Sequence, residues 1–447
     1  MRVRSLLVLV LVVAVLAPVW CDDWSPPTER PSLSVTLALR HGSPLGERGV
    51  DVSAAMAPAD SVFLQGEPID AAFTITNVGS KPYRYMFRNY DRSGRMDEYA
   101  LEVTDTQGRL LPDPRRLSGR GEFVIEAVYF SLLGPGQSFT EHVYLNRWVL
   151  PLAPGSYRAV GAYKAVYVRP PDPAPMPEPF RSPAVPFVIL PRTDAEMRTY
   201  LAGLGRCARF PDDQTQERAV KYLAFTGSSA ALPYLIRTLY TGGMNARFYA
   251  NEGFIYYAEH RDEAVAALVH ALEVHGPTRG MTGVLIHYQA PPSLALGPTL
   301  APTLRWLSAR NPQRRAAAAE ALWLYGRMGD AALVPLLGAL QDSDAGVRLA
   351  AAEALWTYRD PRVLKALLAA SHDPDEGVRL HVAAALIALG DDSQREFLAT
   401  AIEKAQPGAA SEIIGWLAEA LSHRNFAGPK PENRDHQAWV KWLREKE

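Results

Sequence analysis

Two kinds of hydrophobic pattern divide the chain near residue 192. Before this point, short runs alternate apolar and polar residues with turn residues between them, as half-buried β-strands do. In Ile69–Thr76, for example, the odd-numbered positions are apolar, and the turn residues Asn77–Ser80 follow. After residue 192 the apolar positions follow the period of a helix. The pattern therefore predicts an all-β region followed by an all-α region.

About nine short strands are expected in the first region, with no helical stretch between them, which favours a β-sandwich over residues 33–191. The expected strands span 33–39, 69–76, 83–87, 98–104, 109–111, 122–129, 138–146, 156–168 and 184–190. Gly66-Glu67-Pro68 and Leu152–Tyr157, each placed before a strand, resemble turns of immunoglobulin-like modules of bacterial exported proteins. The resemblance implies an immunoglobulin-like sandwich. The proline-rich stretch 169–179 is interpreted as a stiff loop between strands, with a polyproline ligand as the alternative.

The helical region, 195–447, repeats itself. The hexapeptide Asp344–Leu349 recurs as Asp375–Leu380, 31 residues later, and each copy carries an arginine at its fifth position. A small or apolar residue stands three places after each arginine and a large one seven places after it, so both lie on one helical face. The registered positions are Gln216, Arg247, Arg279, Arg315, Arg348 and Arg379.

Each repeat is expected to be a pair of helices. Four residues before the registered position stand Asp212, Asn311, Asp344 and Asp375, which are good N-caps for a first helix. An apolar second helix follows, as at 333–337 and 364–368, and the alanines at 316–319 and 350–352 let neighbouring helices approach closely. Stacking six or seven pairs would bury the apolar faces, which predicts an α-solenoid. We expect the second helices to line its curved face.

The repeat unit resembles the HEAT family, a HEAT/armadillo-type architecture, and within it the short bacterial repeats of phycobilin lyases. The resemblance covers about 211–421. It implies a ladder between adjacent repeats, formed by an Asp near the start of the first helix and an Arg a few residues later. Asp344 with Arg348 and Asp375 with Arg379 match that pattern. Gln216 replaces the first arginine, and Gly243 and His275 replace aspartates, so the ladder is expected to be broken at its N-terminal end.

Two features depart from the regular repeat. Residues 289–293 and Gly297-Pro298 interrupt the third unit and lengthen the loop between its helices, either as a harmless insertion or as a specificity loop. A final helix near 434–446 carries Trp439 and Trp442 on one face. It is expected to cover the open end of the last repeat, with a partner-binding aromatic patch as the alternative.

The N-terminus is expected to carry an export signal. Arg2 and Arg4 precede an apolar run from Leu6 to Ala17, which is typical of a secretory signal peptide, expected here over 1–21. The run is short for a transmembrane span. Trp20 before Cys21 is a poor match to a lipoprotein signal, so membrane contact is expected only if the segment stays uncleaved or lipidated. The protein is expected to be exported to the periplasm or beyond, and to be soluble after cleavage.

Composition narrows the function. A net charge of −1 argues against nucleic-acid binding. No metal-ligand spacing, nucleophile elbow or cofactor fingerprint occurs, so no catalytic, metal or cofactor residue is expected. Cys207 is interpreted as a buried thiol, with a reactive thiol near Arg206 as the alternative. We expect an exported scaffold whose solenoid binds a protein partner and which is not an enzyme. The alternatives are a lyase-type enzyme, by analogy with HEAT-containing bilin lyases, and a structural envelope assembly protein.

Overall fold

The computed structural model describes residues 32–42, 61–87, 98–114, 129–164, 178–257, 260–278, 296–327, 330–358, 360–423, 431 and 435–445. The expected signal peptide (1–21), Arg279, residues 289–293 of the third unit and most of the proline-rich stretch lie outside these ranges.

Most of the described strands follow the predicted alternation, but the strand expected at 122–129 lies outside the described residues except for Tyr129. The described strands are β1 (Leu33–His41), β2 (Val62–Leu64), β3 (Ile69–Asn77), β4 (Tyr83–Phe87), β5 (Tyr99–Thr104), β6 (Tyr129–Leu133), β7 (Ser138–Tyr144), β8 (Gly155–Tyr163), β9 (Phe180–Arg181) and β10 (Val185–Leu190). The expected strand at 109–111 is reduced to a single bridge between Thr104 and Leu110. Neither β2 nor β9 was predicted, because strands of three and two residues are too short to show a period.

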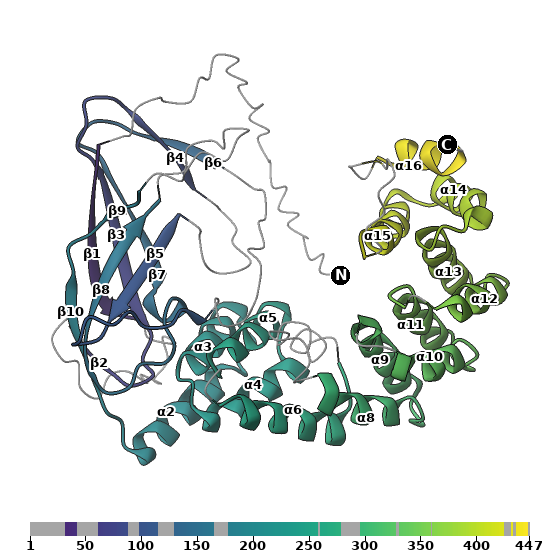
Figure 1. The fold of residues 1–447 in the computed structure, drawn as a ribbon, viewed down its shortest axis with the longest axis horizontal. Helices are drawn as coiled ribbons and strands as arrows, with labels where there is room; N and C mark the ends of the chain where they lie inside the picture. Colours follow the sequence, from purple (N-terminus) through teal and green to yellow (C-terminus); the bar gives the residue numbers. More distant parts are fainter. Residues whose placement is uncertain are drawn as a thin grey trace, which may run out of the picture.

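The described strands form three sheets (Figure 1). One has the order β1-β3-β7, a second has the order β2-β10-β8-β5 with β9 also on β8, and β4 pairs with β6. All neighbours are antiparallel except β2 and β10, which are parallel. In β1 every second side chain is buried, and these side chains share one core with Phe73, Tyr163 and Phe187 of the other strands. The N-terminal part is therefore a β-rich region with its own core.

The helical region begins at α2 (Asp194–Cys207) and continues as pairs. The first helices of the pairs are α3 (Asp213–Phe225), α5 (Met244–Gly253), α9 (Pro312–Leu322), α11 (Ala345–Leu355), α13 (Glu376–Ala388) and α15 (Pro407–His423). The second helices are α4 (Leu232–Thr241), α6 (Arg261–His275), α8 (Leu296–Trp306), α10 (Leu333–Ala339), α12 (Pro361–Ala370) and α14 (Arg395–Lys404). Gly297 and Pro298, expected in a loop, lie in the first turn of α8. None of the described helices is long and apolar enough to cross a membrane.

The stack of pairs is curved, and its inner face is lined by the first helices (Figure 1). Here α9, α11, α13 and α15 follow the inside of the curve, whereas α10, α12 and α14 follow the outside. The expectation that second helices line the curved face is therefore wrong. The first helices are rich in alanine, as in Ala350–Ala352 and Ala383–Ala385, whereas the second helices carry leucine. Since small side chains let helix axes approach, the stack bends towards its alanine-rich side.

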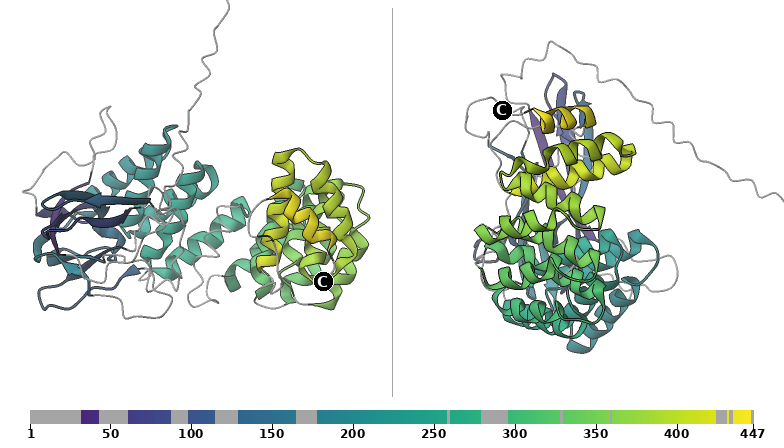
Figure 2. Two further views of the ribbon diagram at one scale, coloured as in Figure 1. Left: turned by 90° about the horizontal axis from the view of Figure 1, so that it is seen from above. Right: turned by 90° about the vertical axis from the view of Figure 1, so that its right-hand side faces the viewer.

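The β-rich region packs against α2 and α3, at the N-terminal end of the stack (Figure 2). The hydroxyl groups of Tyr144, at the end of β7, and Tyr222, in α3, lie 3.1 Å apart, and their rings meet edge to face. Arg192 donates to the carbonyl of Gln65 at 2.9 Å and lies over the ring of Tyr200 in α2. Through these contacts the β-rich region packs on α2 and α3, the helices that begin the stack.

Candidate interaction surface

The registered positions fall at the same place in each described first helix that carries one. Gln216, Arg247, Arg315, Arg348 and Arg379 are each the fourth residue of α3, α5, α9, α11 and α13 respectively. The residues three and seven places later are all at most 1% exposed; they are Ala219, Leu223, Ala250, Phe254, Ala318, Leu322, Ala351, Leu355, Val382 and Leu386. The register read from the sequence therefore marks equivalent positions in successive helix pairs.

The predicted N-caps are confirmed. The side chain of Asp344 accepts a hydrogen bond from the amide of Val347 at 3.3 Å, and Asp375 accepts from Val378 at 3.0 Å. Asp212 and Asn311 cap α3 and α9 in the same way. Each cap satisfies an amide that the first helical turn leaves without an intrahelical partner.

The arginines pair with aspartates that sequence analysis did not single out. Arg315 donates from Nε and Nη2 to both carboxylate oxygens of Asp342 at 2.7 Å. Arg348 makes the same bidentate contact with Asp373, at 2.7 and 2.9 Å. Each acceptor stands two residues before the N-cap of the next first helix, a spacing that the sequence does contain. Each Arg–Asp pair, or rung, therefore joins one repeat to the next.

The rungs also fix the charge of their carboxylates. Hydrogen bonds from Arg315 hold the pKa of Asp342 below its ordinary value, and hydrogen bonds from Arg348 do the same for Asp373. The same aspartates accept from the amides of Asp344 and Asp375 at 2.9 Å, so each one is held by a side chain and a backbone group together.

At the N-terminal end a neutral contact takes the place of a rung. Gln216 donates to the carbonyl of Ala208 at 3.0 Å and accepts from the amide of Gly243 at 2.9 Å. Gly243 precedes α5, so this side chain still connects two successive repeats. The ladder of ion pairs is absent from this position, but a hydrogen-bonded connection remains.

A second contact line runs across the inner helices. His381 of α13 lies between Glu353 of α11, at 3.0 Å, and the ring of Trp416 of α15, whose centre is 4.0 Å from that of the imidazole. His381 is 2% exposed, whereas Glu353 and Trp416 are partly exposed. Sequence analysis did not single out these residues, because a single histidine within an alanine-rich helix gives no pattern.

The two C-terminal tryptophans occupy different environments. In α16 (His436–Arg444), Trp439 is 2% exposed and belongs to the core of the C-terminal repeats. Trp442 is partly buried, and the guanidinium of Arg395 lies 4.6 Å from its ring centre. Since α16 packs mainly on α14, it covers the end of the stack. Of the two, Trp442 alone has surface to offer a partner.

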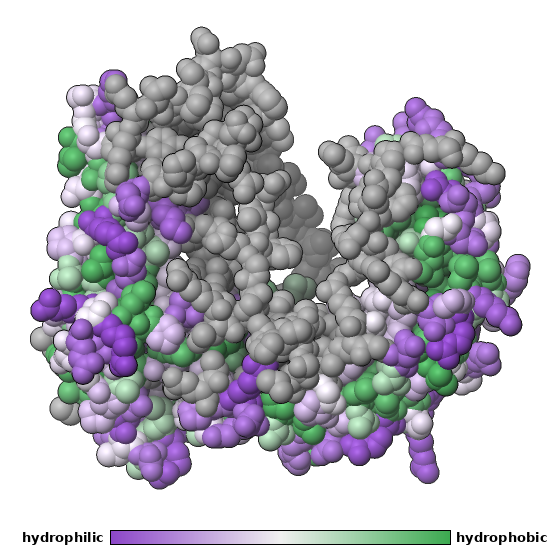
Figure 3. Space-filling model, viewed as in Figure 1, coloured by the Kyte–Doolittle hydropathy of each residue, from purple (hydrophilic) through white to green (hydrophobic). Residues whose placement is uncertain are grey.

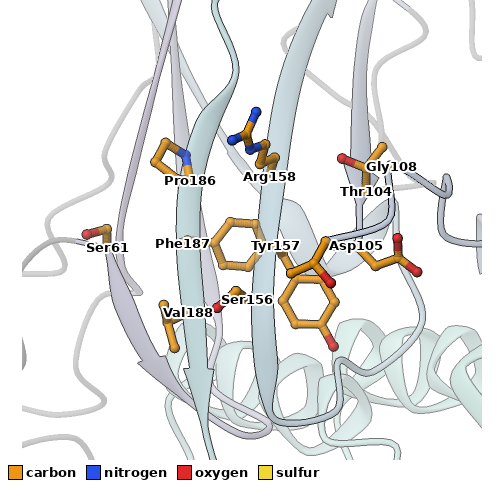
Figure 4. A pocket seen from close by; sticks show the side chains of 11 residues that line it. Ser61, Thr104, Asp105, Gly108, Ser156, Tyr157, Arg158, Pro186, Phe187 and Val188 are labelled. Atoms are coloured by element: carbon orange, nitrogen blue, oxygen red, sulfur yellow. The ribbon is translucent and has the colours of Figure 1, made fainter.

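A hollow of about 600 Å³ lies on the β-rich region, over β5, β8 and β10 and beside the start of β2 (Figure 4). Tyr157, Arg158, Asp105 and several hydroxyl groups line it. Asp105 accepts from the amides of Gln107 and Arg109 at 2.9 Å, and these bonds hold its pKa below the ordinary value. The carboxylate of Asp105 is thus already hydrogen-bonded within its own turn.

The described residues show neither the ligand group of a metal site nor the properties of a reactive thiol. They contain no group of three or more His, Cys, Asp or Glu side chains placed to hold a metal ion. Cys207 is free and 2% exposed, and burial raises the pKa of its thiol. These properties favour the buried-thiol interpretation of Cys207, because a reactive thiol needs a lowered pKa and access.

A comparison with protein families identifies the repeat type of the C-terminal helices. A family model for HEAT repeats matches residues 300–386 and 335–422. The chain is similar to the crystal structure of the Escherichia coli protein YibA, with 14% identity over 57% of this chain and 98% of that chain and a TM-score of 0.33. It is also similar to an engineered protein, with 18% identity over 51% of this chain and 97% of that chain and a TM-score of 0.25. No curated protein matches the sequence. The C-terminal helical region thus contains HEAT repeats.

Proposed function

We propose that the protein is an exported scaffold that binds a protein partner on the inner face of its helical stack. The observation that carries the proposal is the inner row of first helices, of which the two rungs connect α9, α11 and α13 (Figure 1). Stacked repeats of this kind offer extended curved surfaces to their partners.

The solvent-exposed side of α11 shows which kinds of side chain lie on the inner face. Core positions of α11 are fully buried, whereas Gly346, Leu349 and Glu353, spaced three and four apart, keep exposed area on the opposite side. Since α11 lies inside the curve, these residues belong to the inner face. The equivalent positions of α9 are Gln313, Ala316 and Glu320. Two small residues, one leucine, one glutamine and two carboxylates therefore lie on this face.

The outer curve is a weaker candidate. It exposes Val334 (62%), Leu364 (37%) and Leu368 (37%) on α10 and α12. Hydrophobic and hydrophilic residues are interspersed along the visible outer curve in Figure 3. Scattered apolar side chains of this kind are normal on a protein surface.

A matched pair of variants tests the proposal. Leu349→Arg changes the inner face and Val334→Arg makes the same kind of change on the outer face. Pull-down from periplasmic and culture fractions is expected to recover one stoichiometric partner with wild type and Val334→Arg, and to lose it with Leu349→Arg. Circular dichroism checks that both variants fold. Equal recovery by all three proteins would contradict an inner-face site, and self-association alone would favour an envelope assembly role.

The remaining parts of the proposal concern the β-rich region, the N-terminal segment and the absence of catalysis. We take the β-rich region to be an immunoglobulin-like sandwich that orients the stack, supported by its two principal sheets with a shared core. We take residues 1–21 to direct export and to be removed, leaving a soluble protein. We also propose binding rather than catalysis. A turnover that responds to point substitution would contradict that part.

A further inference from the structure

Among the registered arginines that the structure describes, Arg379 is anchored like Arg315 and Arg348 but pairs with no described carboxylate. In each of the last three registered arginines, Nη1 donates to the backbone carbonyl six residues earlier. Arg315 donates to Ala309 at 2.9 Å, Arg348 to Asp342 at 2.8 Å and Arg379 to Asp373 at 2.7 Å. The guanidinium of Arg379 is thus anchored by the same bond at the same place in its helix. Arg315 and Arg348 then use Nε and Nη2 for the next aspartate. Arg379 makes no ion pair with any described residue.

The sequence explains why its carboxylate is missing. The acceptors Asp342 and Asp373 stand two residues before the next N-cap. Before α15 that position is Lys404, which is exposed. The nearest aspartate of the ladder, Asp373, is already held by Arg348. At the equivalent sequence positions the two preceding units carry an arginine and an aspartate, whereas this unit carries an arginine and a lysine.

A second donor completes the site. In the two closed rungs the aspartate also accepts from the backbone amide two residues later, that of Asp344 or Asp375. The equivalent amide before α15 belongs to Gln406, for which the described residues supply no acceptor. Arg247, by contrast, has no side-chain hydrogen bond to a described residue that would hold it in place, so it does not form a comparable site.

We propose that Arg379, with Lys404 and the amide of Gln406, binds the carboxylate of an acidic side chain carried by the protein partner. The planar Nε–Nη2 edge matches a carboxylate in bidentate geometry, and the chain itself uses that edge for aspartate twice. The proposal rests on the proposed scaffold function and names one chemical feature of the partner: an Asp or Glu at the point where it passes the loop between α14 and α15.

The first test closes the open rung from within the chain. Lys404→Asp restores the residue type of the other rungs, so it is expected to raise the melting temperature of the full chain. In the Arg379→Ala background the same substitution is expected to have no such effect. An equal effect of Lys404→Asp with and without Arg379 would overturn the proposal, because the arginine edge would then not be available.

The second test uses a blocked pentapeptide, Ala-Ala-Asp-Ala-Ala, and its Asn counterpart as probes of the folded full chain. The side-chain Nε–H resonance of Arg379 is expected to shift and saturate at millimolar Asp peptide, with roughly tenfold weaker binding of the Asn peptide. The Arg348 resonance, whose edge is occupied, is the internal control, and Lys404→Asp is expected to abolish the shift. Equal shifts with both peptides, or a stronger response to inorganic phosphate, would overturn the proposal. Either outcome is independent of the Leu349→Arg pull-down, so the two proposals can fail separately.

Discussion

Arg348 and Asp373, on two successive repeats, form a bidentate ion pair whose side chains are only 12% and 6% exposed. The contact joins the start of α11 to the loop before α13, so it fixes how far one helix pair can rotate against the next. Arg315 and Asp342 repeat the arrangement one unit earlier. Because neighbouring repeats touch only each other, such a contact sets the local curvature of the inner face.

The rungs predict a specific pH dependence. Arginine hydrogen bonds lower the folded-state pKa of Asp342 and Asp373. A lowered folded pKa adds stability that is fully present above the unfolded value of about 3.9 and is lost as the pH falls through the folded value. The stability difference between wild type and Asp342→Asn/Asp373→Asn should therefore be largest near neutral pH and shrink below about pH 4. Urea unfolding midpoints at several pH values measure it, and a difference independent of pH would contradict the ionic account.

The cap at Asp375 predicts a graded effect of substitution. Asp375→Ala removes the acceptor of the Val378 amide and should lower the free energy of unfolding by about 1 kcal/mol. Asp375→Asn keeps a capping oxygen and should retain most of that stability. Urea titration of the two variants makes the comparison. Equal losses of stability in the two variants would mean that Asp375 stabilises the protein through its charge or its loop and not through capping.

Trp439 predicts a local loss of stability. Trp439→Ala empties a buried site between α16 and the last repeats and should cost about 3 kcal/mol. Hydrogen exchange should quicken in α14 and α15 while α9 stays protected, because repeats transmit instability chiefly to neighbours. Trp442→Ala, at a partly exposed site, is the matched control and should have a smaller effect. Faster exchange throughout the stack would show that α16 does not act as a local cap.

The sequence predicted most of the local structure, because local structure depends on short-range patterns. Alternation placed β1, β3 and β5, and the register placed the first helices α3, α5, α9, α11 and α13 through their fourth residues. The aspartate acceptors were missed because the pairing joins residues 25 and 27 positions apart, Arg348 with Asp373 and Arg315 with Asp342. Only the folded repeat shows that these residues meet.

The direction of curvature and the pairing of strands could not be predicted from the sequence either, because both depend on residues far apart along the chain. Which helix of a pair lies inside depends on the relative size of the side chains on two packed faces, and the first helix α11 buries the three alanines Ala350–Ala352. The parallel pairing of β2 with β10 joins residues 126 positions apart, Val62 and Val188, through a strand of three residues. The Glu353–His381–Trp416 line likewise joins three helices. A periodic pattern carries no information about such partners.

A double-mutant cycle on Arg348 and Asp373 tests most directly whether the ladder joins the repeats into one surface. Arg348→Ala, Asp373→Ala and the double variant should give a coupling free energy of about 1–2 kcal/mol in urea unfolding. The control cycle pairs Arg348→Ala with Asp360→Ala, whose carboxylate is held by Arg362, and should give less than about 0.5 kcal/mol. Equal coupling in the two cycles would contradict the account, because the Arg348–Asp373 contact would then not hold adjacent repeats together.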